Sequence, residues 1–298
     1  FHIDLNGIKQ LLTKGGLCRT RKLAKGEPYE TCFSLITDNK DKFYIGQDKA
    51  KFFVFDATAN ISPQYKVDYV EMIDCTKYLP KLNTTTINLY DLVTSKTQLK
   101  NTDKQKAIFG SIKKVVSKNN PHHQRELYIT HQEYYREFPI WKKRDKDKKL
   151  VDVPCYFGNV KGSNDFCECQ HLNHIGNCRL PDIHFLVQYL IQNPNEYKKI
   201  QSMSEAQSEE YIATLLKYDY GGSYINLSIN QIMMDSILED FEQNIFRSAI
   251  RVRDNTKSVT INAFWSSKTF GELNDMIKNR FGCKGYDALV KYNGIPND

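Results

Sequence analysis

From residue 66 onward the chain alternates between short apolar runs and longer amphipathic stretches, and this alternation limits its possible folds more than any other feature. The apolar runs are typical of strands and occupy residues 69–74, 86–92, 126–130, 153–158, 171–176 and 258–265. The amphipathic stretches have helical spacing and lie near residues 101–118, 131–138, 183–192, 231–250 and 269–282. Strands that alternate with helices favour a parallel sheet with helices on both faces. We therefore predict an α/β fold.

The composition fits a globular protein and mildly favours an anionic partner. The 298 residues could form one large domain or two, and a hydrophobic content of 40% is enough for a buried core. A formal net charge of +7 and a pI near 8.8 favour polyanions such as nucleic acid. The eight cysteines are scattered, as is typical of reduced thiols rather than of a disulfide framework.

The sequence contains no signal for a membrane. No apolar stretch reaches membrane-spanning length, and the N-terminus lacks the basic, apolar and small-residue order of a signal peptide. We therefore expect a cytoplasmic protein, or a nuclear one in a eukaryotic host, without a membrane partner.

The N-terminal block is too small to be a complete nucleotide-binding domain. It contains a predicted amphipathic helix at residues 3–14 and predicted strands at residues 32–36, 42–46 and 51–60. The chain begins with Phe1 rather than methionine. We expect it to be a fragment of a longer protein.

One candidate site is the segment 239–251, which precedes the last predicted strand. Gln243, Arg247 and Arg251 are each four residues apart, so on a helix their side chains project from the same face. The planar arginine fork stays charged, donates paired hydrogen bonds to phosphoryl oxygens and can stabilise charge on a transferring phosphoryl group. The alternative is a solvent-exposed helix whose arginines form weak surface pairs with its glutamates.

Two earlier segments lead from an apolar strand into polar residues. The first is an apolar strand that ends in polar residues, KFFVFDATAN at residues 51–60. The second is an apolar strand that leads into a Gly-Ser-Asn turn, CYFGNVKGSND at residues 155–165. Ligands of α/β sheets gather beyond the carboxyl ends of the strands, so these polar groups can reach a phosphate there. The alternatives are turn or N-cap hydrogen bonds in the first segment and a loop without a partner in the second.

The order of these three segments resembles the motor core of superfamily 2 helicases, in particular the divergent group found in phages and mobile elements. In that group a DATA segment, a KGSN or RGSN segment and a Gln…Arg…IleArg segment follow one another. The resemblance extends over roughly residues 45–265 and implies a RecA-like parallel sheet of the P-loop NTPase type. It implies that residues 1–66 end a first RecA-like domain and that residues 67–298 form the second, with a helical insertion near residues 193–230.

The resemblance implies that the chain supplies catalytic arginines to ATP. Arg251 would reach the γ-phosphate, with Arg247 as the second choice, and Gln243 would sense the nucleotide. The commonest helicase pattern has a glycine where this chain has Phe246, and its two arginines are three rather than four residues apart. This departure leaves open which arginine reaches the γ-phosphate.

The other segments receive roles in nucleotide and nucleic-acid binding. The resemblance implies that Asp56 and Thr58 join nucleotide hydrolysis to movement of the nucleic acid, and that Gly162 and Asn164 touch the nucleotide cleft. It assigns contacts with the nucleic-acid backbone to Thr130, Asn159, Lys161 and Ser163. DNA is the expected partner in preference to RNA.

The sequence lacks a GxxxxGK[ST] phosphate-binding loop and a DExH or DExD carboxylate pair. ATP and Mg²⁺ would therefore be held mainly by an upstream RecA-like domain, and we expect no ATP hydrolysis by this chain alone. The full-length protein would be an ATP-dependent helicase or translocase.

Two other functions stay open. The first is a nucleic-acid-binding module on the same fold that has lost motor activity. The second is a zinc-stabilised interaction protein that uses Cys167, Cys169, His171, His174 and Cys178. The spacing of these residues is not that of standard zinc knuckles, and in a strand Leu172 and His174 would face one side while His171 faces the other. We therefore predict no metal site.

Overall fold

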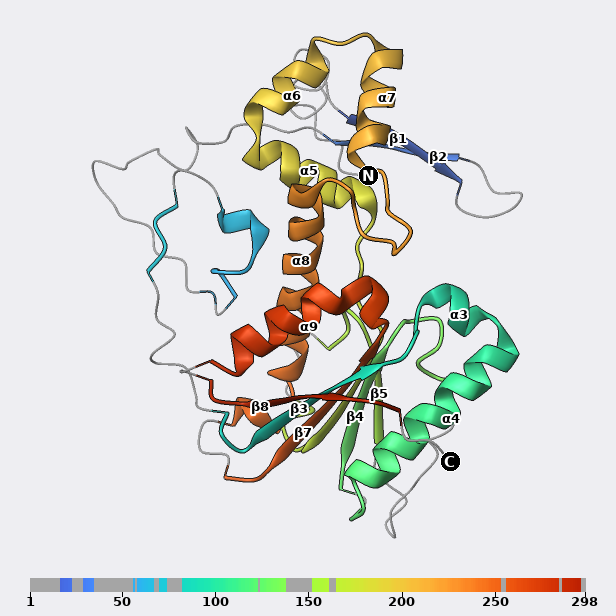
Figure 1. Ribbon diagram of the computed structural model, residues 1–298, viewed down its shortest axis with the longest axis vertical. Coiled ribbons are helices and arrows are strands. Elements are labelled where there is room, and N and C mark those ends of the chain that lie inside the picture. The colour runs from blue at the N-terminus through green and yellow to red at the C-terminus, as the bar shows by residue number, and fades with distance from the viewer. Residues whose placement is uncertain are drawn as a thin grey trace. The chain divides into compact units, whose positions relative to one another are not determined.

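Figure 1 shows the computed structural model of the chain. The structure describes residues 17–22, 29–34, 56, 58–66, 70–73, 82–122, 124–137, 152–160, 165–252, 256–283 and 286–295. The chain divides into two compact units. One contains residues 1–57, 180–218 and 224–232, and the other, here called the sheet unit, contains residues 58–179, 219–223 and 233–298.

The sheet unit is built on six parallel strands. They are β3 (Thr85–Asp91), β4 (Glu126–Thr130), β5 (Asp152–Tyr156), β6 (His171–Ile175), β7 (Val259–Trp265) and β8 (Leu289–Asn293). They lie in the order β5-β4-β6-β7-β3-β8, and every neighbouring pair is parallel. The predicted α/β class is confirmed, and the architecture is consistent with the Rossmann and RecA-like class of folds.

One face of the sheet is covered by α4 (Thr102–Asn119), which follows the short helix α3 (Lys96–Lys100). The Asn101 side chain accepts a hydrogen bond of 3.1 Å from the backbone N–H of Lys104 and so caps the start of α4. Apolar residues at helical spacing, among them Ile112 and Val116, pack against Tyr128 and Phe264 of the sheet. This burial gives the helix its stability, since an isolated helix of this length is marginal in water.

The opposite face carries α8 (Leu227–Ile245), whose residues from Met233 onward belong to the sheet unit, and α9 (Ser267–Phe281). Phe241 of α8 packs edge-on against Trp265 of β7 with ring centroids 5.7 Å apart, and against Phe281 of α9 at 6.0 Å. Helices therefore cover both faces of the sheet, as the alternating sequence predicts.

A row of buried polar side chains, here called the amide row, crosses the sheet beneath α4. Each amide donates to the next residue in the same direction: Asn293 to Asn88 (3.1 Å), Asn88 to Asn262 (3.2 Å) and Asn262 to Asn173 (2.9 Å). Asn173 then donates to the Glu126 carboxylate at 3.3 Å. The row joins β8, β3, β7, β6 and β4, and its three central asparagines are in direct register.

The row is also tied to α4. Asn119, the last residue of α4, donates to the Asn262 side chain at 2.7 Å and to the Tyr90 hydroxyl at 2.9 Å. The following residue, Asn120, donates to the Glu126 carboxylate. A register slip of one residue would turn these amides to the other face and leave them unpaired, at a cost of about 1–3 kcal/mol for each group.

The described residues of the other unit form three complete helices, the first residues of α8 and a hairpin. The helices are α5 (Asp182–Gln192), α6 (Pro194–Gln201) and α7 (Glu205–Leu215), and the hairpin pairs β1 (Leu17–Lys22) with β2 (Tyr29–Ser34). Within this unit the Asp182 carboxylate at the start of α5 accepts hydrogen bonds from Tyr218 and, at 2.7 Å, from Tyr224. These bonds hold the chain after α7 against α5.

Most elements of the sheet unit lie where the sequence predicts them, with three corrections. The predicted helix 131–138 is wrong, because its described residues form turns. The predicted strand 69–74 is wrong at residues 70–73, which lie in neither a strand nor a helix. The predicted helix 231–250 starts at Leu227 and ends at Ile245, earlier than expected. The elements predicted at residues 3–14, 42–46 and 51–55 lie outside the described residues, and the proposed boundary near residue 66 stays a prediction.

The amide row gives a test of the fold. The Asn262 side chain accepts two hydrogen bonds through its oxygen and donates one through its nitrogen. Asn262→Ala removes all three, so we expect the free energy of unfolding to fall by roughly 2–4 kcal/mol in urea titrations. Asn293→Ala, at the half-exposed end of the row, is the matched control and should cost about 1 kcal/mol or less. Equal costs for the two variants would show that the row does not hold the sheet.

Candidate functional site

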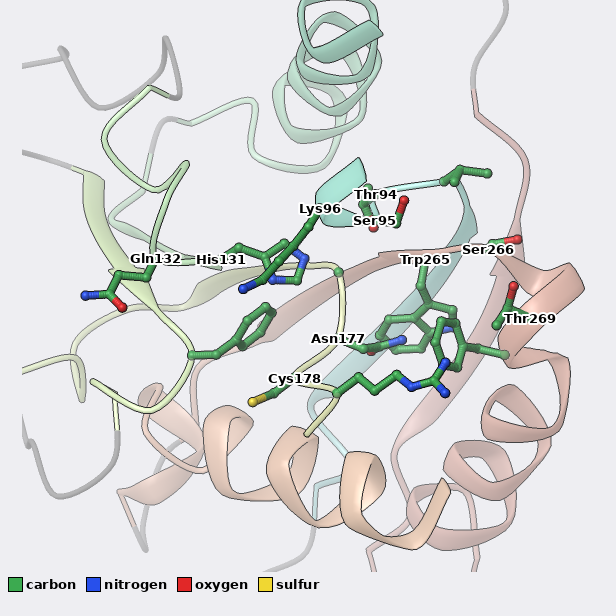
Figure 2. Close-up of a pocket in the computed structure, with 15 residues that line it drawn as sticks. Thr94, Ser95, Lys96, His131, Gln132, Asn177, Cys178, Trp265, Ser266 and Thr269 are labelled. Carbon is green, nitrogen blue, oxygen red and sulfur yellow. The ribbon is translucent and has the colours of Figure 1, made fainter. Parts of the chain in front are cut away.

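A cavity of about 480 Å³ lies at the carboxyl ends of the parallel strands of the sheet unit (Figure 2). It is bordered by the residues that directly follow four strands and by the end of β7. The lining residues are Val93, Thr94, Ser95, Lys96, His131, Gln132, Phe157, Gly176, Asn177, Cys178, Arg179, Trp265, Ser266, Thr269 and Phe270.

The topology explains why a cavity forms at this edge. The chain leaves β3 towards α4 on one face and leaves β7 towards α9 on the other, although β3 and β7 are neighbours (Figure 1). Connections that diverge to opposite faces leave a crevice between them, and α/β sheets bind ligands at such points. The Thr94 hydroxyl donates to the Phe264 carbonyl at 2.8 Å and holds the loop after β3 beside β7.

Two buried polar groups face the cavity without a protein partner. Neither the nitrogen nor the oxygen of the Asn177 amide has a hydrogen-bond partner among the described residues, although the side chain is only 7% exposed. The Nε2 atom of His131 likewise has none within the described ranges. Most buried polar groups in proteins form hydrogen bonds, so two unpaired groups in one cavity indicate a site for a polar ligand or for water.

Gly176 makes room for the His131 ring. Its φ of +86° is a conformation that side chains rarely adopt, and a Cβ at this position would lie 2.9 Å from His131 Nε2. Burial, followed by the nearby charge of Lys96, lowers the pKa of His131 to about 4. The imidazole is therefore neutral near pH 7 and can donate or accept at Nε2.

The cavity also has cationic and aromatic walls. Lys96 is exposed and pairs with Glu133 at 2.9 Å, while Arg179 donates to the Gly222 carbonyl at 3.1 Å. Trp265 closes one side, its indole N–H fixed at 2.8 Å to Asn274 of α9. The arrangement can hold a flat ring against aromatic walls with an anionic group near the cations.

The predicted arginine stripe is wrong in its geometry, because α8 ends before the arginines. The Ser248 hydroxyl donates to the Ile245 carbonyl at 2.7 Å, and the Ala249 N–H donates to the Cys169 carbonyl at 2.9 Å. These bonds draw the chain out of the helix into a short 3₁₀ turn, η3 (Ala249–Arg251). Gln243 lies on the last turn of α8, where it donates to Glu239 at 3.2 Å. Because the arginines lie beyond the end of α8, Gln243 does not share a helical face with them.

The structure nevertheless leaves Arg247 and Arg251 close enough to repel each other. Burial and the positive charge of Arg251 both lower the pKa of Arg247. Arg247 is half-buried, and its Nε has no hydrogen-bond partner in the part of the chain that the structure describes. Because Cys169 lies just before β6, this segment is at the amino ends of the strands, at the opposite edge from the cavity.

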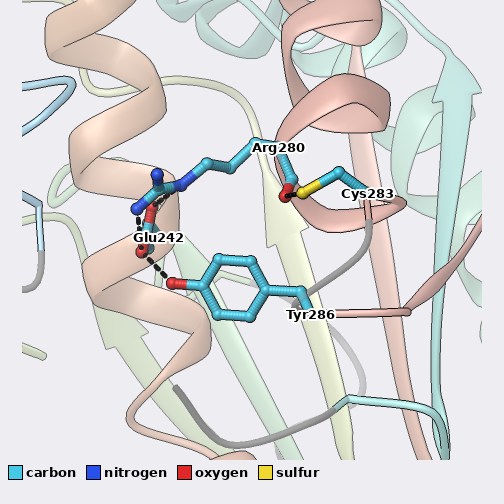
Figure 3. A network of polar contacts seen from close by, with 4 residues as sticks. All are labelled: Glu242, Arg280, Cys283 and Tyr286. Atoms are coloured by element: carbon cyan, nitrogen blue, oxygen red, sulfur yellow. Dashed lines mark hydrogen bonds and ion pairs between the residues drawn. The ribbon is translucent and has the colours of Figure 1, made fainter. Parts of the chain in front are cut away.

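A buried ion pair holds the last turns of α8, which precede these arginines in the sequence (Figure 3). Arg280 of α9 donates to both carboxylate oxygens of Glu242, at 2.9 and 3.0 Å, and Tyr286 donates to the same carboxylate at 2.7 Å. Burial would lower the pKa of Arg280, but the hydrogen bond and charge of Glu242 outweigh it and raise this pKa. Phe246, in place of the glycine of the commonest helicase pattern, packs against Tyr286 with ring centroids 5.9 Å apart.

The remaining predicted residues are spread over the sheet unit and its boundary. Asp56 is half-buried, and Thr58 is buried in a turn, where its carbonyl accepts from two following N–H groups. Thr130 is 0% exposed at the end of β4, so it has no direct contact with a nucleic acid in this conformation. Asn159 is exposed in the turn after β5. Lys161, Gly162, Ser163 and Asn164 lie outside the described residues.

The structure describes all five residues of the candidate zinc cluster, Cys167, Cys169, His171, His174 and Cys178. No group of three or more His, Cys, Asp or Glu side chains suited to a metal occurs in the described ranges. His171 and His174 face opposite sides of β6, as the strand pattern predicts, since His171 bonds to Gln124 at 2.8 Å and His174 packs against Phe241 of α8.

Sequence reasoning missed the cavity residues, including Asn177 and His131. Both follow a predicted strand directly, which is the one signal that could have found them. The residues that follow β4, β6, β7 and β3 meet in one cavity because these strands are neighbours in the sheet. The order of the strands cannot be predicted from local sequence patterns.

Comparison of the chain with protein-family models, curated proteins and solved structures gives no match. The fold itself is thus the level at which the chain can be classified: an α/β domain with a parallel six-stranded sheet. Among the described residues, no helix is long and apolar enough to cross a membrane.

The buried histidines predict a loss of stability in mild acid. Burial lowers the pKa of His131 and His171 to about 4 and that of His174 to about 3, whereas unfolded imidazole has a pKa of about 6.5. The unfolded chain therefore binds more protons between these values, so stability is full above about pH 6.5 and falls as the pH decreases towards about 4.

Urea unfolding at about pH 7.5 and about pH 5 measures this effect. The parent should lose stability between the two values, and His131→Gln should lose less, because one of the titrating groups is gone. An equal loss in parent and variant would show that the buried His131 ring is not held neutral by the fold.

Proposed function

We propose that the chain is the second RecA-like domain of an ATP-dependent nucleic-acid helicase or translocase, which supplies arginines to ATP. The observation that carries this proposal is the Arg247 and Arg251 pair. Burial, followed by the charge of Arg251, lowers the pKa of Arg247, and the Nε of Arg247 lacks a hydrogen-bond partner in the described part of the chain. Two neighbouring guanidinium groups repel unless an anion lies between them, and a phosphoryl group fits their planar donors.

The surroundings of the pair support a role that needs a fixed position. The buried Glu242–Arg280 pair and the Tyr286 hydroxyl hold the last turns of α8, from which the arginine segment extends. An arginine that stabilises charge on a transferring phosphoryl group must be placed to within a fraction of an ångström, and rigid supports of this kind serve that need.

The parallel sheet and the order of the three sequence segments also favour the motor over other α/β functions. Asn159 lies exposed beyond the carboxyl end of β5, where it can donate to a phosphate of a nucleic-acid strand. Lys161, Ser163 and Asn164 follow it in sequence, and we propose that this segment holds the strand, with DNA preferred to RNA. Thr130 is buried, and its carbonyl accepts a hydrogen bond of 3.0 Å from the Phe157 N–H, so we propose that it positions the turn after β5 and does not touch the nucleic acid directly.

The described residues fit part of the nucleotide only. The arginine pair suits the γ-phosphate, and Asp56, Thr58 and Gly162 remain candidates for the cleft side of the domain. No cluster of acidic side chains within the described ranges suits Mg²⁺. Mg²⁺ and the rest of ATP would be held by an upstream domain, which also supplies the general machinery of hydrolysis.

A module without motor activity is the second candidate, because the chain has no GxxxxGK[ST] loop of its own. In that case the arginines would bind phosphate without any hydrolysis. The zinc-stabilised alternative has no support among the described cysteines and histidines.

ATP turnover by the full-length protein, measured with saturating single-stranded DNA, tests the proposal. We expect Arg251→Ala to lower turnover by about 10³- to 10⁵-fold, because an arginine finger contributes about that much, and Arg247→Ala to impair it as well. Lys113→Ala, an exposed charge on α4, is the control and should leave turnover at the parent rate.

Thermal melting in parallel separates loss of function from loss of folding. The motor proposal fails if both arginine variants turn over ATP at the parent rate. A full-length parent that binds DNA but hydrolyses no ATP would instead establish the motor-inactive module.

A further inference from the structure

The cavity at the carboxyl edge of the sheet unit is separate from the arginine pair that carries the proposed function. It lies beyond the ends of β3, β4, β6 and β7, whereas Arg247 and Arg251 lie near the amino ends of the strands. The two sites can therefore be tested independently.

The first evidence for a ligand is the Asn177 amide, labelled at the cavity in Figure 2. The side chain is 7% exposed, and neither its nitrogen nor its oxygen has a partner among the described residues. Such a group has lost its water without gaining a protein hydrogen bond, which destabilises the folded chain. A ligand that offers one acceptor and one donor side by side would pair both atoms at once.

The second evidence is the Nε2 atom of His131, which also lacks a partner within the described ranges. Gly176 at φ +86° packs so close to this ring that a Cβ would lie 2.9 Å from Nε2. The neutral imidazole and the carboxamide add hydrogen-bonding groups to a cavity that Lys96 and Arg179 also line, so the site suits a ligand that has both a hydrogen-bonding ring and an anionic group.

The third evidence is the chemistry of the other walls. Phe157 and Phe270 are half-buried and provide apolar surfaces against which an aromatic ring can pack, while Trp265, 2% exposed, borders the cavity at the end of β7. Lys96 and Arg179 bring positive charge to the same cavity. The volume of about 480 Å³ lies within the range of about 300–1,000 Å³ that is usual for small-molecule sites.

We propose that this cavity binds a nucleoside monophosphate unit, with the base against the aromatic walls and paired with the Asn177 amide. A nucleobase edge carries a donor and an acceptor side by side, as the carboxamide requires, and asparagine pairs with such edges in two hydrogen bonds. The phosphate lies towards Lys96 and Arg179. The unit can be a free mononucleotide or a single nucleotide of a nucleic-acid strand.

Isothermal titration calorimetry of the chain with AMP, GMP, CMP and UMP tests the site, with the matching nucleosides and inorganic phosphate as partial ligands. We expect at least one mononucleotide to bind at a single site, and its nucleoside and inorganic phosphate to bind at least about 10-fold more weakly. Failure of all four mononucleotides to bind at up to about 10 mM overturns the proposal. Inorganic phosphate that binds as tightly as the mononucleotide overturns it as well.

Two variants locate the ligand. Asn177→Leu keeps the size of the side chain but removes the amide, so affinity should fall by about 10- to 100-fold, while the melting temperature stays equal or rises because an unpaired buried amide is gone. Lys96→Ala should weaken the mononucleotide but not its nucleoside, and Lys113→Ala should change neither. Parent-like affinity in Asn177→Leu overturns the assignment of the base. Because Lys96 is exposed, we expect Lys96→Ala to fold. It therefore tests the site even if Asn177→Leu fails to fold.

Competition identifies the source of the nucleotide. An oligonucleotide that displaces the mononucleotide and loses affinity in Asn177→Leu shows that the cavity takes a nucleotide of a strand. An oligonucleotide that does not compete shows that it takes the free mononucleotide. Neither result depends on ATP turnover, so failure of the motor proposal and failure of this site are distinguishable.

Discussion

The parallel sheet depends on one buried interaction, the amide row that joins five of its six strands. Hydrophobic faces hold helices on a sheet, but they tolerate small shifts because apolar contacts are not directional. Amides that donate in sequence from Asn293 through Asn88, Asn262 and Asn173 to Glu126 tolerate none. The row therefore fixes which residues are opposite each other, and with them which loops meet at each edge of the sheet.

The two edges that this register defines carry different chemistry. At the amino edge, the buried Glu242–Arg280 pair supports the segment that contains Arg247 and Arg251, where burial and the charge of Arg251 lower the pKa of Arg247. At the carboxyl edge, diverging connections after β3 and β7 leave a cavity with neutral polar groups. In the amide row every asparagine finds a partner within the protein, whereas Asn177 in the cavity finds none among the described residues. We infer from this difference that the asparagines of the amide row stabilise the fold, whereas Asn177 binds a ligand.

The sequence predicted the α/β class and most strands because their signals are local. The run at residues 126–130 is rich in apolar and β-branched residues, and the run at residues 171–176 places Leu172 and Ile175 between polar residues; both became central strands. β8 was missed because it is mostly exposed and lacks an apolar run. The end of α8 could not be predicted, because it depends on the Cys169 carbonyl, almost eighty residues away in sequence.

The candidate site was predicted only in part, for the same reason. Arg247 and Arg251 could be selected from the sequence because arginine spacing is local, although their shared helical face was wrong. His131 and Asn177 could not be selected, because neither is unusual in its own segment. They become a site when β4 and β6 pair, which brings the turns that follow them to one cavity.

The contrast between paired and unpaired amides is the central claim, and side-chain amide spectra of the chain labelled with ¹⁵N at asparagine test it most directly. We expect slowly exchanging amide protons for Asn88, Asn173 and Asn262, with chemical shifts that do not change when a mononucleotide is added. We expect the chemical shifts of the Asn177 amide to change on addition. Rapid exchange in the amide row, or an Asn177 signal whose shift no mononucleotide changes, would contradict these expectations.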